Sequence, residues 1–375
     1  MPMRLRFLSL VLVVPIAAGA QTLRLRPAAS LAEEFADIRG VREVAAGRVL
    51  VSDYIDQRVV LADFSSGRVS ARVTEGSGPQ EARLPTRLVP VAGDSTLLVD
   101  LGNARLLLLD GNGRVVRTLA NLPEGALGVR AVDRRGQFYL TIPGWMERDK
   151  ALPNDSVRVV RLDPATGQRT TVAVVQGERM RSDSREPSRT PRIPTVGYAG
   201  YDGWTMAPDG SLRIVRGGDY RIEVTPAGGG ATTITAAHRY PTATVTGADR
   251  ERYVRRFMAM SPTSGKGANG GMGFTPTPSA AELAALVRGT EFAERHPMFD
   301  PDRVVVDKGG TLWVGRPTQD GQPVRYDRFA TNGTSLPAIE LPAGRRIVAF
   351  GSAAMYVIAE SELGLQHLER YDPPR

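Results

Sequence analysis

The stretch RVLVSDYIDQRVVLADFSSGRV, residues 48–69, is followed by a second version of itself, STLLVDLGNARLLLLDGNGRV, at residues 95–115. Three pairs of matching residues recur at a constant spacing of 47: Asp53 and Asp100, Arg58 and Arg105, and Asp63 and Asp110. A period of this size with alternating apolar strands is typical of propellers and solenoids, because one unit buries its apolar faces only against its neighbours. We therefore expect a repeat architecture.

The hairpin recurs six times along the chain. Each copy has an alternating apolar strand, a tight turn and a second apolar strand, as in AVDRRGQFYL (131–140) and VVVDKGGTLWVG (304–315). The six turns contain Gly47, Gly93, Gly136, Gly210, Gly310 and Gly351. A third strand and, after another small-residue turn, a fourth strand follow. The pattern predicts an all-β fold, a six-bladed β-propeller with four antiparallel strands in each blade.

The last blade needs a strand from elsewhere, since the sixth unit ends at Arg375 after its third strand. Residues 22–26 (TLRLR) alternate and have no hairpin partner of their own. We predict that they form the outer strand of the last blade, which closes the ring and removes an open sheet edge. Ser30 and Glu33 have the spacing of a capping box, which predicts a helical turn before the first inner strand.

Residues 1–20 have the pattern of a signal peptide. Arg4 and Arg6 precede an apolar run at residues 7–18, and Ala18-Gly19-Ala20 supplies small residues for cleavage. We expect an exported protein, periplasmic or secreted, whose mature residues 21–375 form one propeller. No later hydrophobic stretch reaches membrane-spanning length, so we expect no membrane span, and a monomer.

Composition argues against nucleic acid as a partner. The chain has no cysteine and a formal net charge of +8, but its basic residues form no run and only three of the 48 are lysine. The arginine bias agrees better with GC-rich codon usage than with selection for a polyanion. A chain of this length buries enough apolar surface without disulfides.

Two stretches carry a resemblance to a known family. LLVDLGNARLLLLD (97–110) resembles an NHL-repeat core, and EGSGPQEARLPT (75–86) is similar to the glycine-rich, proline-ended connection between such blades. The chain thus resembles exported bacterial six-bladed β-propellers of the NHL-repeat type. The resemblance implies the propeller fold. Such propellers mostly bind proteins, RNA or glycans, and some of their relatives are enzymes.

All long connections fall at 143–155, 176–200 and 236–300. Numbering the strands of a blade a to d from the inside, these are b–c or d–a connections, which leave a blade from the same side. We call that side the insertion face and expect function there, because loops on a rigid scaffold carry binding and catalysis.

Residues 236–300 form a partly helical insertion between blades 4 and 5. The sequence predicts one helix after Thr246 and a second after Ser279, with Glu282 completing a capping box, and we expect their apolar faces to pack on the propeller. The glycine-rich stretch 264–273 between them lacks the context of a phosphate loop and is interpreted as a hinge.

The candidate binding residues combine arginines of the second long connection with nearby aromatic residues. They are Trp145, Arg185, Arg189, Arg192, Tyr198 and Tyr201. Guanidinium groups beside aromatic rings suit carboxylate-bearing glycans or peptide carboxylates. We expect a protein, peptide or glycan ligand at this loop-rich face.

No set of residues predicts catalysis, a metal or a cofactor. The chain has no thiol and no serine in a nucleophile elbow, and its three histidines lie in separate regions. Asp53 and Asp100 recur at equivalent strand ends, so we interpret them as structural, with Arg58 and Arg105 tying adjacent strands. We predict a non-catalytic binding module.

The alternative is a metal-dependent, lactonase-like propeller hydrolase. Such enzymes need a Glu, an Asn and an Asp from separate blades around one divalent metal. Asn103 and Asp219 occupy b–c connections and are its candidate ligands, with no third ligand apparent.

Overall fold

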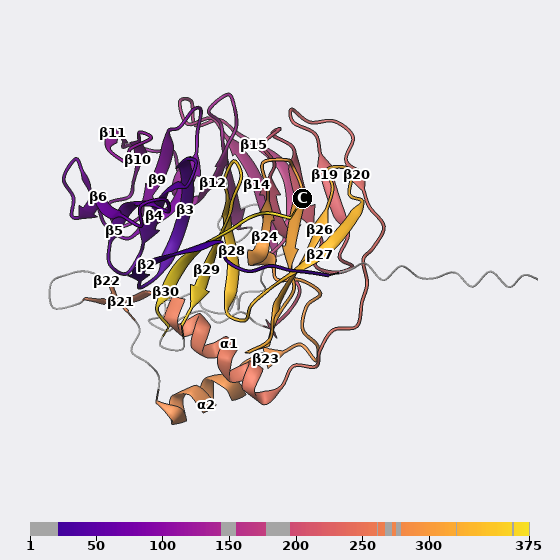
Figure 1. Cartoon of the computed structure of the whole chain (residues 1–375). Coiled ribbons are helices and arrows are strands. Elements are labelled where there is room, and N and C mark those ends of the chain that lie inside the picture. The colour runs from indigo at the N-terminus through magenta and orange to yellow at the C-terminus, as the bar shows by residue number, and fades with distance from the viewer. Residues whose placement is uncertain are drawn as a thin grey trace, which may run out of the picture.

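The computed structural model describes residues 22–143, 155–177, 196–260, 262–266, 272–274, 279–319, 321–361 and 364–374. Six small antiparallel sheets stand in a ring (Figure 1). This arrangement confirms the six-bladed β-propeller.

The strands of each blade follow one another from the centre outward. Blade 1 holds β3 (Ile38–Ala45), β4 (Arg48–Asp53), β5 (Arg58–Asp63) and β6 (Val69–Glu75), and blade 2 holds β8 (Pro85–Pro90), β9 (Thr96–Asp100), β10 (Arg105–Leu109) and β11 (Val115–Leu119). Blade 3 holds β12 (Val129–Val132), β13 (Phe138–Pro143), β14 (Ser156–Leu162) and β15 (Arg169–Gln176), and blade 4 holds β17 (Gly203–Met206), β18 (Leu212–Val215), β19 (Ile222–Thr225) and β20 (Thr233–Ile234). Blade 5 holds β24 (Val304–Val306), β25 (Leu312–Gly315), β26 (Val324–Phe329) and β27 (Ser335–Leu341).

Blade 6 is completed from the N-terminal region, but by a different strand from the one expected. Its own strands are β28 (Arg345–Phe350), β29 (Met355–Glu360) and β30 (Gln366–Tyr371), and its outer strand is β2 (Ala29–Phe35), antiparallel to β30. The predicted segment 22–26 instead contributes β1 (Leu23–Arg24), which pairs in parallel with β27 of blade 5.

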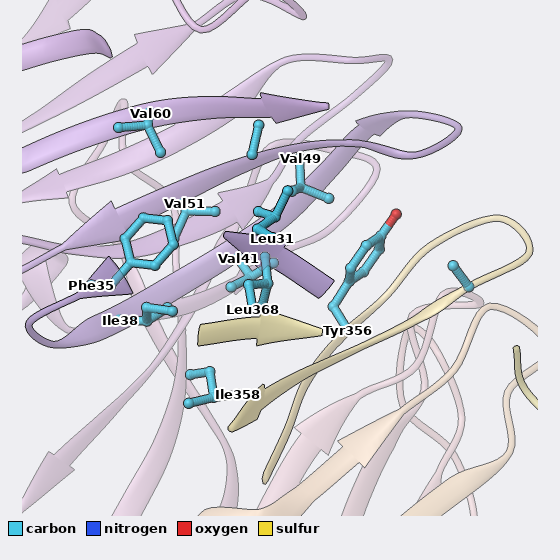
Figure 2. Close-up of a cluster of buried hydrophobic side chains, with 12 residues drawn as sticks. Leu31, Phe35, Ile38, Val41, Val49, Val51, Val60, Tyr356, Ile358 and Leu368 are labelled. Carbon is cyan, nitrogen blue, oxygen red and sulfur yellow. The ribbon is translucent and has the colours of Figure 1, made fainter. Parts of the chain in front are cut away.

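The reason lies in which residues reach the core. Leu31 and Phe35 are 3% and 0% exposed, and they pack between blades 6 and 1. Figure 2 shows both side chains among Ile358 and Leu368 on one side and the valines of blade 1 on the other. The helical turn predicted at Ser30 is wrong, because Ser30 pairs with Glu369 in the sheet and the neighbouring leucine needs that strand to reach the core.

The repeated aspartates are structural, as predicted. Asp53 is fully buried and accepts hydrogen bonds from the backbone N–H groups of Ala36 and Asp37, both at 3.0 Å. Asp100, also fully buried, accepts from the Arg105 Nε at 2.7 Å. Each carboxylate therefore joins the second strand of its blade to the connection that enters the blade.

The hairpin turns carry the predicted glycines. Five of them adopt positive φ, which side chains disfavour: Gly47, Gly93, Gly136, Gly210 and Gly310, with φ between 71° and 85°. These turns lie on the face opposite to the insertions. Short elements complete the chain outside the blades: β7 (Glu81–Ala82), η1 (Ala126–Gly128), β16 (Val196–Gly197), β23 (Glu291–Phe292) and η3 (Pro301–Arg303).

The insertion forms two helices below the strands in Figure 1. They are α1 (Gly247–Met260) and α2 (Ala280–Arg288), and the Ser279–Glu282 capping box is present. Their apolar faces pack mainly on each other, not on the propeller core as expected: Val254, Met258 and Leu283 form a separate cluster whose other members also belong to the insertion. Two amphipathic helices that are close in sequence bury their apolar faces most simply against each other.

Part of the glycine-rich stretch is extended rather than a hinge. β21 (Pro262–Lys266) and β22 (Met272–Phe274) pair as antiparallel strands, and residues 267–271 lie outside the described residues. Among the residues that the structure describes, none of the helices is long and apolar enough to cross a membrane.

Candidate functional site

The central channel opens on the insertion face through the first residues of the inner strands. Each inner strand is entered from a d–a connection, so its first residues lie at that end of the channel, which we call the channel mouth. Arginines occupy this position in five blades: Arg39 in β3, Arg87 in β8, Arg130 in β12, Arg303 just before β24, and Arg346 in β28. The helix α1 adds Arg256.

Three aspartates lie among these arginines, and two of them are already paired. Asp37 accepts from the Arg39 Nε at 2.6 Å, and Asp300 lies 3.0 Å from the Arg303 Nε. Among the described aspartates of the mouth, only Asp302 is left to balance the remaining four arginines, since Asp202 close by is paired with Arg216.

Those four arginines are Arg87, Arg130, Arg256 and Arg346. Within the described part of the chain, their guanidinium groups make no hydrogen bond or ion pair. The channel mouth therefore carries an excess of positive charge.

The pKa values reflect this excess. Desolvation lowers the pKa of Arg87 to about 10, and repulsion from Arg130 and Arg39 adds to the effect, while Asp302 opposes it. Burial likewise lowers the pKa of Arg346. Arg87 nevertheless keeps solvent-accessible surface. Partial desolvation without a counter-charge is the condition under which an arginine gains most from binding an anion.

The pKa of Asp302 shifts in the opposite direction and is raised. Burial raises its pKa and the nearby Asp300 raises it further, whereas Arg256, Arg130 and Arg346 lower it. The same three arginines thus act on one carboxylate, which places blades 3, 5 and 6 and helix α1 around a common point.

A cavity of about 410 Å³ lies at this point, between α1 and the propeller. Its walls include four aromatic residues: Tyr198, Tyr201, Trp204 and Tyr253. They also include Arg130, Arg256 and Asp302. The size falls in the range of small-molecule sites, and the lining combines flat apolar surfaces with charged groups, as ligand pockets do.

Tyr198 links the cavity to the insertion. Its hydroxyl donates to the backbone carbonyl of Asp249 at 2.9 Å, and its ring lies 4.6 Å from that of His296 and 5.0 Å from that of Tyr253. The preceding residue, Gly197, pairs with Phe292 through β16 and β23 so closely that an added Cβ would lie 2.5 Å from the phenylalanine ring. The insertion is held in register with this cavity wall.

A second cavity, of about 430 Å³, opens at the other end of the channel. It is lined by residues of all six inner strands and their turns, including Arg42, Arg134, Asp133 and Lys308. Both cavities are lined by Arg130 and Trp204, whose guanidinium carbon lies 5.5 Å from the ring centroid. The two cavities therefore meet at this cation–π pair.

The structure brings together only part of the predicted binding set. Tyr198 and Tyr201 line the mouth cavity. Trp145, Arg185, Arg189 and Arg192 lie outside the described residues.

The arginines of the inner strands were not among the sequence candidates. A signal for them exists: in five units an arginine stands at or next to the start of the innermost strand, where an apolar residue would serve the blade equally well.

Asn103 and Asp219, the candidate ligands of the hydrolase alternative, have structural partners. The Asn103 side-chain amide donates to the Gly76 carbonyl and to Asp100, both at 2.9 Å, and its carbonyl accepts from Ser77. Asp219 lies 3.5 Å from the Arg221 guanidinium. Among the described residues, no group of three or more histidine, aspartate or glutamate side chains is placed to hold a metal ion.

Solved structures with a similar arrangement include proteins of several activities. The chain is similar to a gluconolactonase from Xanthomonas campestris, with 15% identity over 94% of this chain and 96% of the other and a TM-score of 0.46. It is similar to a calcium-binding regucalcin from Agrobacterium tumefaciens, with 14% identity over 94% of this chain and 98% of the other and a TM-score of 0.44. It is also similar to a PQQ-bound aldose sugar dehydrogenase from Streptomyces coelicolor, with 12% identity over 92% of this chain and 98% of the other and a TM-score of 0.42. No family profile matches the chain, and neither does the sequence of any curated protein.

Proposed function

We propose that this chain is an exported, non-catalytic binding propeller that holds its ligand in the mouth cavity, between α1 and the inner strands. The observation that carries the proposal is a cavity whose wall combines aromatic residues with two arginines that have no ion-pair partner among the described residues, while two further arginines of this kind act on Asp302 in the same wall. A purely structural channel mouth would gain nothing from this uncompensated charge, which costs folding free energy.

The ligand is a protein segment, a peptide or a glycan that reaches the insertion face. The mouth cavity suits part of such a ligand, while the insertion and the other long connections offer surface around it. The leader at residues 1–20 would bring the protein to the periplasm or the exterior, where such ligands occur.

The test is a binding screen of the purified mature protein against glycans, peptides and lactones, read by calorimetry, with product analysis of every mixture. Tyr201→Ala and Arg256→Gln change the mouth cavity, and Val116→Ala, on the outer strand β11, is the matched control. We expect a ligand that binds the wild type and the control and binds both cavity variants at least tenfold more weakly.

Two results would contradict the proposal. Hydrolysis of a lactone that stops when the metal is chelated would favour the hydrolase alternative. Equal binding by the cavity variants would place the site elsewhere on the molecule.

A further inference from the structure

The charge balance of the mouth cavity indicates the kind of anion that it accepts. Arg130 and Arg256 stand in the wall, and Arg87 and Arg346 act on the same Asp302 from the neighbouring blades. Guanidinium groups bind carboxylates through paired, charge-assisted hydrogen bonds. Several of them around one cavity provide more donors than a single carboxylate needs, so its orientation would be well defined.

Asp302 limits where a negative group can bind. Its carboxylate offsets one of the four positive charges, so an anion gains most where it contacts the arginines and stays away from Asp302. The side chain of Asp302 also offers hydrogen-bond acceptors to a hydroxyl-bearing ligand.

The rest of the cavity suits a ring with hydroxyl groups. Tyr198 and Tyr201 are partly exposed in the cavity wall and offer aromatic surface on which the C–H face of a pyranose can lie. Polar side chains stand beside them: Thr141 and Gln176 line the same cavity and can bond sugar hydroxyls from the edge. A purely apolar carboxylic acid would leave these groups without partners.

We propose that the mouth cavity binds a sugar acid, a pyranose with a single carboxylate such as a hexuronate unit, with the carboxylate on Arg130 and Arg256 of the cavity wall and the ring against Tyr201. This inference rests on the proposed function and specifies the ligand of the same site.

The experiment measures binding of three probes to the mature protein by calorimetry: D-glucuronate, D-glucose and inorganic phosphate, at constant ionic strength. Arg130→Gln and Arg256→Gln remove one guanidinium each from the cavity wall, and Arg134→Gln, at the other end of the channel, is the matched control. We expect glucuronate to bind at least tenfold more tightly than glucose, and each mouth variant to lose tenfold or more while the control is unchanged. Thermal melting of each variant shows that it is folded.

Three results would overturn the sugar-acid assignment. Phosphate binding as tight as glucuronate and lost in Arg256→Gln would assign the mouth to phosphate. Glucose binding as tight as glucuronate would show that the carboxylate is not recognised. If none of the probes binds but a ligand from the screen is lost in Tyr201→Ala, the proposed function stands and only this inference fails.

Discussion

The contact between blades 6 and 1, which closes the ring and which we call the seam, has the opposite effect on stability from the channel mouth. At the seam, Leu31 and Phe35 lie fully inside an apolar cluster shared by two adjacent blades. At the mouth, Arg130 and Arg256 line a solvent-accessible cavity, Arg87 and Arg346 also act on its Asp302, and none of the four has an ion-pair partner among the described residues. The seam stabilises the ring, whereas the mouth keeps like charges close together at a cost. A site that opposes stability in this way is where a ligand is expected.

The largest effect is expected at the seam. Phe35→Ala removes a buried ring between blades 6 and 1 and should lower the free energy of unfolding by about 3–5 kcal/mol. Urea unfolding measures the loss. The control, Val116→Ala on the exposed side of β11, should cost less than about 1 kcal/mol. A Phe35→Ala protein as stable as the wild type would show that β2 does not seal the ring.

A matched pair of aspartates separates the structural scaffold from the mouth. Asp100→Asn weakens the bond to the Arg105 Nε inside a fully buried network, so we expect a loss of about 3 kcal/mol. Asp302→Asn, in the accessible mouth, should change stability by less than about 1 kcal/mol. Equal losses in the two variants would mean that Asp302 also serves the scaffold.

The attachment of α1 should depend on acid pH. Burial raises the pKa of Asp249, but hydrogen bonds from Thr246 and His296 outweigh this effect and lower the pKa from 3.8 to about 2. Because the folded pKa is the lower one, this carboxylate contributes its stability above pH 4 and loses it as the pH falls toward 2. We expect the free energy of unfolding to decrease over this range, and Asp249→Asn to be less stable at pH 5 and to show a shallower decrease. An unchanged slope in the variant would assign the pH dependence to other groups.

The smallest expected effect is a slight gain in stability rather than a loss. Arg87→Gln relieves repulsion from Arg130 and Arg39 and should leave stability equal or raise it by less than about 1 kcal/mol, since solvent in the channel screens these charges. Arg134→Gln should be neutral. A clear loss of stability in Arg87→Gln would mean that this arginine supports the fold, and the contrast between mouth and seam would not hold.

Local pattern predicted most strands because hairpins are decided by residues close in sequence. The third strands of blades 1 and 5, Arg58–Asp63 and Val324–Phe329, form after their hairpins as the pattern predicts, and the capping box at Ser279 forms. The outer strand of blade 6 was misplaced because its partner, β30, is more than 300 residues away. The Ser30–Glu33 spacing suits a helix start equally well, and only the core contact of Leu31 and Phe35 decides in favour of a strand.

The sequence by itself determined the period, the turns and therefore the propeller with all its long connections on one face, since each of these depends on residues a few positions apart. The mouth cavity was decided by the tertiary structure alone. Arg87, Arg130 and Arg346 stand in three different units, and nothing in any one unit shows that their charges act on the same carboxylate, Asp302. They do so because closing the ring turns the start of every inner strand toward one axis, and α1 adds Tyr253 and Arg256 to the same cavity.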